Sequence, residues 1–154
     1  MKPSESTPRD DFVVLVAEDD EHDVIAIRRA WRTLGISNPL VIVNDGEACL
    51  DYLFRRGDYA TATLPGLLLL DLHMPRRDGL ETLRAIRADA RTTRLPVVIL
   101  TTSKAEEDRV RSYDMGANAY VVKPVGFENF TLALNSIHEF WKLVERPELP
   151  HAPR

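Results

Sequence analysis

The chain contains little cysteine and no long apolar run. Cys49 is its single cysteine, so no disulfide forms within the chain, as in proteins of a reducing compartment. The longest uninterrupted apolar run has six residues, whereas a membrane-spanning helix needs about 20. Residues 1–11 lack the apolar core of a secretory signal. We therefore expect a cytoplasmic protein with no membrane association.

The chain also lacks an excess of positive charge. Its 20 Lys and Arg residues face 24 Asp and Glu residues, for a formal net charge of −4. Four arginines recur at helical spacing: Arg84, Arg87, Arg91 and Arg94. Glu81 and Asp89 interrupt this patch, and a mixed charged helix face is usually a solvated one. Because nucleic-acid binders need a strong basic field, we expect no nucleic-acid partner.

The length and composition fit one globular domain. The 154 residues are 44% hydrophobic and 29% charged, and a typical domain has roughly 150 residues. Residues 1–11 are rich in proline, serine and charge, and residues 147–154 contain three prolines. These patterns predict a disordered N-terminal lead-in at 1–11, a domain at 12–146 and a C-terminal tail at 147–154.

Two hydrophobic periodicities alternate along that domain. Short apolar runs, typical of strands buried on both faces, lie at Phe12–Ala17, Leu40–Val43, Leu67–Leu70, Val97–Leu100 and Ala119–Val122. Apolar residues at steps of three and four predict helices near 24–34, 46–56, 80–89, 105–115 and 127–144. The alternation predicts an α/β fold with a doubly wound, five-stranded parallel sheet in the flavodoxin-like order 2-1-3-4-5.

Polar residues follow four of the predicted strands. They are Glu18, Asp19 and Asp20 after the first strand, Asp71 after the third, Thr101 at the end of the fourth and Lys123 after the fifth. In doubly wound sheets the carboxyl ends of the strands form the ligand site. Clustered carboxylates repel one another unless a cation neutralises them, and Mg²⁺ prefers oxygen ligands. We expect one shallow pocket with several carboxylates, a hydroxyl and an ammonium group.

Each of these residues also has a simpler structural explanation. An acidic run such as 18–21 is favoured at the start of a helix by capping and by the helix dipole. Asp71 would open a turn, and Lys123 would be a surface residue before one. Their shared position at the ends of neighbouring strands favours a common site over these separate explanations.

With these positions assembled, the chain resembles a response regulator receiver domain, the CheY-like family of two-component signalling. The matching segments are Val16–Asp20, Leu70–Pro75, Asp78–Gly79, Pro96–Thr101 and Gly116–Pro124. Each segment is weakly specific, whereas their common order and spacing is highly specific. The resemblance extends over about 12–144 and implies a (βα)5 receiver fold.

The resemblance also implies a phosphorylation site that depends on a metal. It makes Asp71 the phosphoacceptor. Glu18, Asp19 and Asp71 are implied to hold Mg²⁺, with the main-chain carbonyl of His73 as a further ligand. Glu18 stands where many members of the family have aspartate, which is a familiar variation.

The last two strands carry the implied response to phosphorylation. Thr101 is implied to bind the phosphoryl group and Lys123 to pair with it. Tyr120 is implied to be an aromatic switch that turns inward when Thr101 moves, and Pro124 to follow a cis peptide bond. We expect output through the face formed by the fourth helix, the fifth strand and the fifth helix. His73 and Ser103, near the pocket mouth, are expected to tune the lifetime of the aspartyl phosphate.

A narrower resemblance is to stand-alone regulators paired with bacterial phytochrome-type histidine kinases. It rests on Thr101–Ser103, the connection at 57–65, the aromatic pair Phe140–Trp141 and the lack of an output domain. The implied function is to accept a phosphoryl group from such a histidine kinase. The implied chemistry is self-catalysed phosphotransfer and autodephosphorylation, with no other enzymatic activity.

The last predicted helix is apolar over a wide arc. Phe127, Phe130, Leu134, Ile137, Trp141 and Val144 form a stripe that is mostly core. Phe140 and Leu143 lie off this stripe. An exposed apolar patch at the end of a helix favours self-association. We expect a homodimer with Phe140, Trp141 and Leu143 as its contact residues.

Several other functions compete with this interpretation. A haloacid dehalogenase-type phosphatase needs a second aspartate two residues after its nucleophile, where His73 stands. A flavodoxin-like electron carrier needs a hydroxyl-rich phosphate loop after the first strand, where the acidic run 18–21 would repel a phosphate. Within the receiver family, a phosphate sink and a phosphorylation-independent binding module remain as alternatives.

Overall fold

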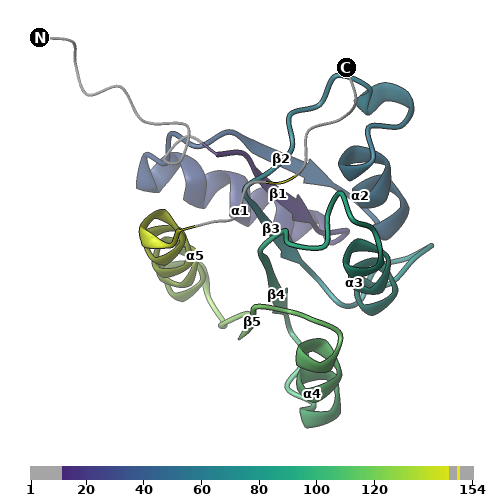
Figure 1. Ribbon diagram of the computed structural model, residues 1–154. Helices are drawn as coiled ribbons and strands as arrows, with labels where there is room; N and C mark the ends of the chain where they lie inside the picture. The colour runs from purple at the N-terminus through teal and green to yellow at the C-terminus, as the bar shows by residue number, and fades with distance from the viewer. Residues whose placement is uncertain (1–11, 146–148, 150–154) are drawn as a thin grey trace, which may run out of the picture.

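Five parallel strands form one sheet at the centre of the molecule (Figure 1). The structure, a computed structural model, describes residues 12–145 and 149, so the lead-in predicted at 1–11 and all of the predicted tail but Leu149 lie outside the described residues. The strands are β1 (Val14–Ala17), β2 (Leu40–Val43), β3 (Leu67–Leu70), β4 (Val97–Thr101) and β5 (Ala119–Val122). Their order is β2-β1-β3-β4-β5, which confirms the predicted topology.

Helices follow the strands in alternation. They are α1 (Glu21–Leu34), α2 (Gly46–Leu53), α3 (Gly79–Ala88), α4 (Glu106–Asp114) and α5 (Phe127–Leu143), with a short 3₁₀ helix, η1, at Gly57–Tyr59. The side chains of Asp20, Asp45 and Asp78 accept hydrogen bonds from backbone N–H groups in the first turns of α1, α2 and α3. Such caps satisfy donors that a helix cannot pair internally.

Several element boundaries differ from the prediction by one to three residues. The second helix ends at Leu53 rather than near residue 56. Arg55 has a φ of 55°, which takes the chain out of the helical region. β1 begins at Val14 rather than Phe12, because the Phe12 carbonyl accepts a hydrogen bond from the Asn38 side chain.

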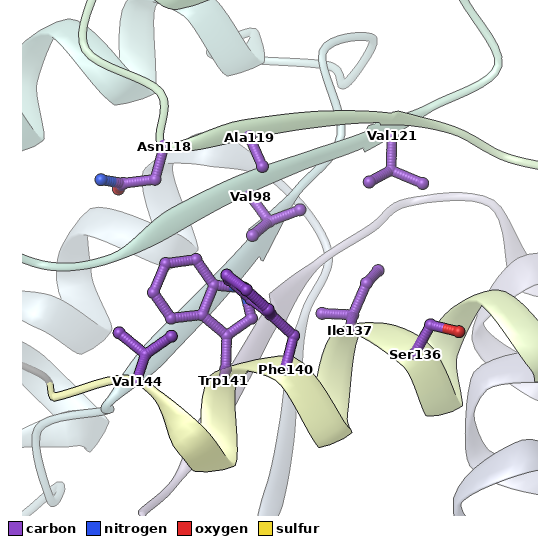
Figure 2. Close-up of a pocket in the computed structure, with 9 residues that line it drawn as sticks. All are labelled: Val98, Asn118, Ala119, Val121, Ser136, Ile137, Phe140, Trp141 and Val144. Carbon is purple, nitrogen blue, oxygen red and sulfur yellow. The ribbon is translucent and has the colours of Figure 1, made fainter.

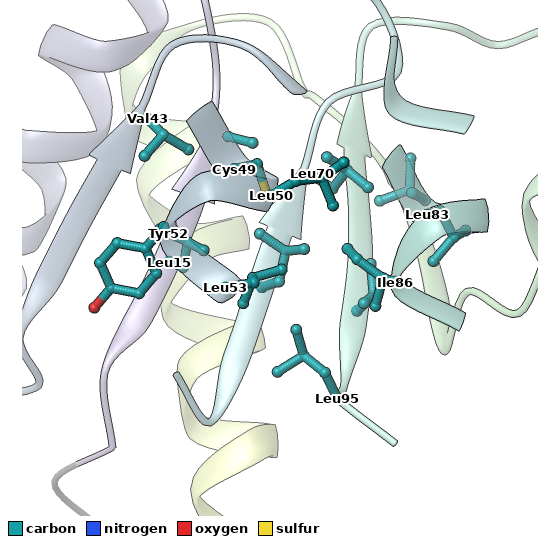
Figure 3. Packing of buried hydrophobic residues seen from close by; sticks show 14 of the residues in the cluster. Leu15, Val43, Cys49, Leu50, Tyr52, Leu53, Leu70, Leu83, Ile86 and Leu95 are labelled. Carbon is teal, nitrogen blue, oxygen red and sulfur yellow. The ribbon is translucent and has the colours of Figure 1, made fainter. Parts of the chain in front are cut away.

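The sheet separates two apolar cores. Neighbouring residues of β3 point to opposite faces: Leu68 and Leu70 join one cluster, and Leu67 and Leu69 join the other. α2 and α3 cover the first face, where Cys49, Leu50, Leu53, Leu83 and Ile86 pack on the strands (Figure 3). α1 and α5 cover the second face, with Ile27, Ala30, Trp31, Phe130 and Leu134. The edge strands β2 and β5 are mostly half-buried.

This arrangement brings the carboxyl ends of the central strands to one edge of the sheet. Ala17 pairs with Leu70, and Leu70 pairs with Ile99. Glu18 after β1 and Asp71 after β3 therefore start from the same level of the sheet, and β4 continues two residues beyond Ile99 to Thr101. Among the described residues, none of the helices is long and apolar enough to cross a membrane.

Candidate functional site

Three carboxylates meet at that edge of the sheet. Glu18 and Asp19 follow β1, and Asp71 follows β3. One oxygen of each lies within 4.8 Å of an oxygen of the others. Glu18 is 2% exposed and Asp71 is 7% exposed. The three residues predicted from the strand ends are thus brought together.

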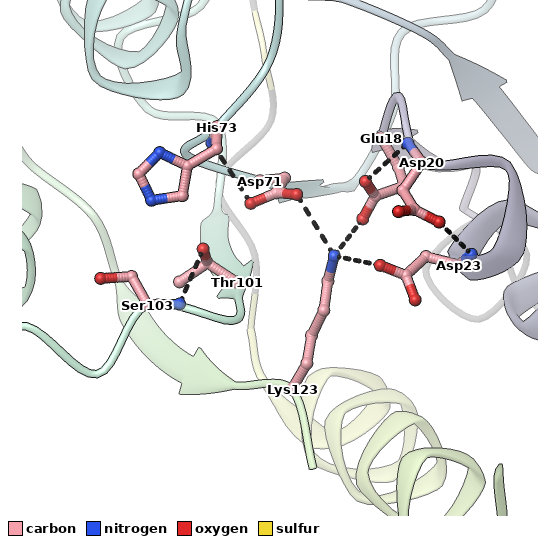
Figure 4. A network of polar contacts seen from close by, with 8 residues as sticks. All are labelled: Glu18, Asp20, Asp23, Asp71, His73, Thr101, Ser103 and Lys123. Atoms are coloured by element: carbon pink, nitrogen blue, oxygen red, sulfur yellow. Dashed lines mark hydrogen bonds and ion pairs between the residues drawn. The ribbon is translucent and has the colours of Figure 1, made fainter. Parts of the chain in front are cut away.

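The Lys123 ammonium lies between the carboxylates of Glu18, Asp71 and Asp23, as Figure 4 shows. It donates to Glu18 Oε1, to Asp71 Oδ2 at 3.2 Å and to Asp23 Oδ2 at 2.8 Å. The Lys123 backbone N–H donates to the Thr101 carbonyl at 2.7 Å, which fixes the base of the side chain beside β4. A single buried ammonium therefore bridges carboxylates from β1, β3 and α1.

Burial and mutual charge shift the pKa values in this cluster. Burial, together with the Asp71 charge, raises the pKa of Glu18 to about 7, although the hydrogen bond from Lys123 opposes this shift. Burial lowers the pKa of Lys123, but its hydrogen bonds to Asp23 and Glu18 and the Asp71 charge outweigh that effect and raise it. Lys123 is therefore a permanent cation, whereas Glu18 changes charge near neutral pH.

The loop after β3 holds Asp71 in place. The His73 backbone N–H donates to Asp71 Oδ1 at 3.3 Å, and the Gly79 N–H donates to the Leu72 carbonyl at 2.9 Å. A Cβ added at Gly79 would lie 2.3 Å from the Asp71 carbonyl oxygen. Glycine at the start of α3 is therefore required for this close approach to the loop.

A chain of hydrogen bonds runs from the cluster toward β5 and α4. Thr101 is fully buried, and its hydroxyl accepts from the Ser103 N–H at 3.3 Å. The Tyr120 hydroxyl donates to the Ser103 carbonyl at 3.0 Å. The Ser103 hydroxyl donates to Asp108 Oδ2 at 2.6 Å, and His73 Nε2 lies 4.0 Å from the same oxygen. Ser103 thus connects Thr101, Tyr120 and the first turn of α4.

The prediction of a cis peptide bond before Pro124 is wrong. None of the peptide bonds in the described part of the chain is cis. With a trans bond, the Lys123 ammonium already reaches Glu18 and Asp71. Since trans is the preferred isomer even before proline, the contacts of Lys123 need no cis turn.

Sequence reasoning missed two acidic residues near the site. Asp23 lies in the acidic first turn of α1, where such residues are common. Asp19 precedes the N-cap residue Asp20, so its spacing of four residues from Asp23 is not a turn of α1 and gave no signal. Asp108 lies in the acidic first turn of α4 and likewise carried no signal.

The end of α5 borders an apolar groove. The groove lies between α5 and the edge strand β5, has a volume of about 510 Å³ and includes Phe140, Trp141 and Val144 among its lining residues (Figure 2). Phe140 is 59% exposed and Leu143 is 85% exposed. Trp141 is 8% exposed and belongs to the core. Of the three predicted contact residues, two are therefore surface residues.

The donor set at the strand ends fits a hard divalent cation. Glu18, Asp19 and Asp71 offer carboxylate oxygens, the ligands that Mg²⁺ and similar ions prefer. The permanent Lys123 charge lies beside the same oxygens. A negatively charged group that reaches Asp71 would meet two sources of positive charge, which is the arrangement needed to transfer a phosphoryl group.

Comparison with known proteins gives consistent matches. The sequence model of the response regulator receiver domain matches residues 14–135. Response regulator Rcp1 of Synechocystis sp. is 35% identical over 140 residues, which cover 91% of this chain and 94% of that protein. The probable methanogenesis regulatory protein FilR2 of Methanothrix harundinacea is 38% identical over 132 residues, covering 86% of this chain and 84% of that protein.

Solved structures agree with these sequence matches. The phosphorylated cyanobacterial phytochrome response regulator RcpA superposes with a TM-score of 0.84 at 35% identity, covering 89% of this chain and 99% of that one. The Mn²⁺-bound form of Rcp1 superposes with a TM-score of 0.82 at 34% identity, with the same coverage of 89% and 99%.

Proposed function

The chain belongs to the response regulator receiver family, and from that premise we propose that Asp71 accepts a phosphoryl group from a histidine kinase with the help of Mg²⁺. The observation that carries this proposal is the group of Glu18, Asp19 and Asp71, in which the buried Glu18 and Asp71 carboxylates accept from the Lys123 ammonium. The proposal is supported by the phosphorylated state of the similar RcpA structure.

The proposed reaction is an in-line displacement at phosphorus. An Asp71 oxygen forms a bond to the phosphorus of a kinase phosphohistidine while the P–N bond breaks, and the imidazole leaves with that electron pair. Lys123, held 3.2 Å from Asp71 Oδ2, stabilises the charge on the phosphoryl oxygens. The product is an acyl phosphate, so attack by water later returns the Asp71 carboxylate and releases inorganic phosphate.

We assign the cation to the three carboxylates of the site. Glu18, Asp19 and Asp71 would hold Mg²⁺, together with the main-chain carbonyl of His73. When bound, Mg²⁺ neutralises negative charge on the transferring phosphoryl group. The Mn²⁺-bound form of the similar Rcp1 supports a divalent cation in this family.

The proposed output begins at Thr101. A phosphoryl group on Asp71 offers oxygens to the Thr101 hydroxyl, which in this structure accepts from the Ser103 N–H. Movement of Thr101 toward that group would pull on Ser103 and release the Tyr120 hydroxyl from the Ser103 carbonyl. Phosphorylation would thereby shift a two-state equilibrium that changes the surface of α4, β5 and α5.

The first test is phosphorylation by acetyl phosphate, followed by intact mass. With Mg²⁺ the protein should gain one phosphoryl group, and EDTA should prevent the gain. The variant Asp71→Asn should gain none, because an amide oxygen is a poor nucleophile and leaves no carboxylate to phosphorylate. Unchanged labelling in Asp71→Asn would place the acceptor elsewhere and refute the proposal.

We further propose that the phosphoryl donor is a phytochrome-type histidine kinase. The similarity to RcpA and to a bacteriophytochrome response regulator, which is 38% identical with a TM-score of 0.71, supports this choice. A purified, phosphorylated kinase of the phytochrome type should transfer its phosphoryl group to Asp71 faster than phosphorylated kinases of other types do. Faster transfer from kinases of other types would contradict the phytochrome assignment.

We also propose that two copies of the chain associate through the groove between α5 and β5. The exposed Phe140 side chain in this groove and the exposed Leu143 at the end of the same helix support the proposal, because such apolar surface is stabilised when a second copy covers it. Light scattering at high micromolar concentration should give the mass of a dimer, and a monomer at that concentration would contradict the proposal.

A further inference from the structure

Asp23 contacts the Lys123 ammonium but is not one of the three clustered carboxylates of the site. It lies in the first turn of α1, and its side chain is 32% exposed. Its Oδ2 accepts from Lys123 Nζ at 2.8 Å. The three residues whose carboxylate oxygens lie within 4.8 Å of one another are Glu18, Asp19 and Asp71. Asp23 is thus a partner of Lys123 at the rim of the site.

Lys123 and a divalent cation compete for the same oxygens. The ammonium donates to both Glu18 and Asp71 (Figure 4), and these two carboxylates also belong to the group that fits the cation. Two positive charges at such short range repel strongly where water is largely excluded. Binding of the cation therefore requires Lys123 to give up part of its present contacts.

The position of Asp23 offers Lys123 an alternative partner. The Asp23 backbone N–H donates to Asp20 Oδ1 at 3.1 Å, so this residue is fixed by the N-cap of α1. Its carboxylate faces Lys123 from the side of α1 (Figure 4). A lysine side chain has four flexible carbon–carbon bonds and moves its charge without any change in the backbone.

We propose that Asp23 is a positioning residue, which holds the Lys123 ammonium aside when a divalent cation binds to Glu18, Asp19 and Asp71. The inference rests on the cation site of the proposed function. Without Asp23, Lys123 would keep Glu18 and Asp71 as its carboxylate partners among the contacts seen here. The cation would then compete with the full ammonium charge, and its apparent affinity would fall.

Calorimetric titration of the whole protein with MgCl2 tests this inference directly. Asp23→Asn should weaken Mg²⁺ binding by about tenfold, which corresponds to ~1.4 kcal/mol. Asp20→Asn is the matched control, because it removes one neighbouring negative charge that makes no ion pair with Lys123, and asparagine also caps helices well. This control should weaken binding by less than about threefold, as expected for an exposed charge.

A double-mutant cycle separates positioning from simple charge. In the Lys123→Gln background, Asp23→Asn should change Mg²⁺ affinity no more than Asp20→Asn does, because the competing ammonium is gone. Lys123→Met provides a second background should the glutamine variant not fold, as checked by circular dichroism. A tenfold loss that persists without Lys123, or equal losses in the two aspartate variants, would overturn the inference.

These experiments distinguish failure of the role of Asp23 from failure of the proposed function. If the wild-type protein binds no Mg²⁺ at millimolar concentration, both the cation site and the role of Asp23 are refuted. If it binds Mg²⁺ and is phosphorylated, but the effect of Asp23→Asn does not depend on Lys123, then the role of Asp23 is refuted and the function stands.

Discussion

Asp108 connects two side chains that flank Asp71, the proposed phosphoacceptor. It accepts a hydrogen bond of 2.6 Å from the Ser103 hydroxyl and lies 4.0 Å from His73 Nε2. The Ser103 backbone N–H donates to the Thr101 hydroxyl, and the His73 backbone N–H donates to Asp71. We therefore expect these three side chains to control access of water to a phosphoryl group on Asp71, rather than the affinity for the cation.

Removal of the Asp108 carboxylate should shorten the lifetime of the aspartyl phosphate. Asp108→Ala frees Ser103 and His73 to move, so water enters more easily and hydrolysis accelerates by about tenfold, or ~1.4 kcal/mol. The decay of phosphorylated protein measured by intact mass checks this, with Mg²⁺ affinity unchanged. Asp108→Asn, whose amide oxygen still accepts from Ser103, should decay at nearly the wild-type rate. Equal decay rates in the two variants would show that the hydrogen bond from Ser103 to Asp108 does not control hydrolysis.

The raised pKa of Glu18 predicts pH-dependent binding of Mg²⁺. A pKa of about 7 means that Glu18 carries a proton in a growing fraction of molecules below pH 7, and a metal ligand must be deprotonated. Apparent Mg²⁺ affinity should therefore fall by about tenfold per pH unit well below pH 7, where one proton is released per ion bound. Calorimetry at pH 5.5, 6.5 and 7.5 measures this slope.

The variant Glu18→Gln provides the control for that slope. Glutamine has no proton to release in this range, so binding should be weaker at pH 7.5 but less dependent on pH. A slope equal to that of the wild type would assign the released proton to another group.

The sequence predicted which residues at strand ends lie together, and it missed the residues on helices that contact them. Asp71 and Lys123 follow apolar runs, so the fold class alone placed them at one edge of the sheet. Asp23 and Asp108 lie in acidic first turns, where capping and the helix dipole already explain an acid. Asp23 contacts Lys123, which is 100 residues away in the sequence, and Asp108 contacts Ser103 in the loop after β4. Only the assembled structure therefore identifies their roles.

At the scale of elements, a buried polar contact joins α5 to the loop between α1 and β2. His138 Nε2 lies 2.8 Å from Asn38 Oδ1, and the Asn38 amide donates to the Phe12 carbonyl at 2.9 Å. The Asn38 oxygen is therefore the acceptor and His138 the donor. The Trp31 indole N–H donates to the Asn38 carbonyl at 2.9 Å. One asparagine thus joins α1, α5 and the segment before β1.

His138 should make the stability of the fold depend on pH. Burial and the nearby Lys142 charge lower its pKa below the ordinary value, against the opposing Glu139. As pH falls, the unfolded chain therefore binds the proton at a higher pH than the folded protein does. The contribution of His138 to the free energy of unfolding is present above about pH 6.5 and is lost as pH falls below it. His138→Gln should reduce the free energy of unfolding by about 1 kcal/mol at pH 7.5.

Urea unfolding followed by circular dichroism at pH 7.5 and pH 5.5 measures this difference. The gap between wild type and His138→Gln should narrow at the lower pH, because protonation costs the wild type alone. His22→Gln, a change in the exposed first turn of α1, is the control and should leave the free energy of unfolding at pH 7.5 close to that of the wild type. A gap of constant size would show that His138 does not titrate differently in the two states.

The order of the elements was predictable because each strand and helix has its own periodicity. The apolar runs became β2, β3 and β5 with the predicted bounds, and Gly35 ends α1 with a φ of 64°. The end of α2 was not predictable from periodicity, since it depends on the positive φ of Arg55. The start of β1 likewise depends on the contact of Asn38 with Phe12, which is distant in sequence.

At the scale of the whole molecule, the site and the groove lie at different places on the last two strands. Thr101 at the end of β4 is part of the site, whereas Val98 at its start lines the groove. Tyr120 on β5 is hydrogen-bonded to Ser103, and its neighbours Ala119 and Val121 line the groove. A change at Asp71 that moves Tyr120 is therefore positioned to alter the surface on which we place the second copy.

Charge placed in the groove should separate the two copies. Phe140→Asp introduces a carboxylate where the dimer would bury an aromatic side chain, and the loss of a contact worth ~2 kcal/mol or more raises the dissociation constant by at least about thirtyfold. Sedimentation velocity over a range of concentrations measures this constant. Leu132→Asp is the matched control, because Leu132 is also on α5 and 63% exposed but does not line the groove. It should dimerise as the wild type does, and an equal effect of both substitutions would show that the copies meet elsewhere on α5.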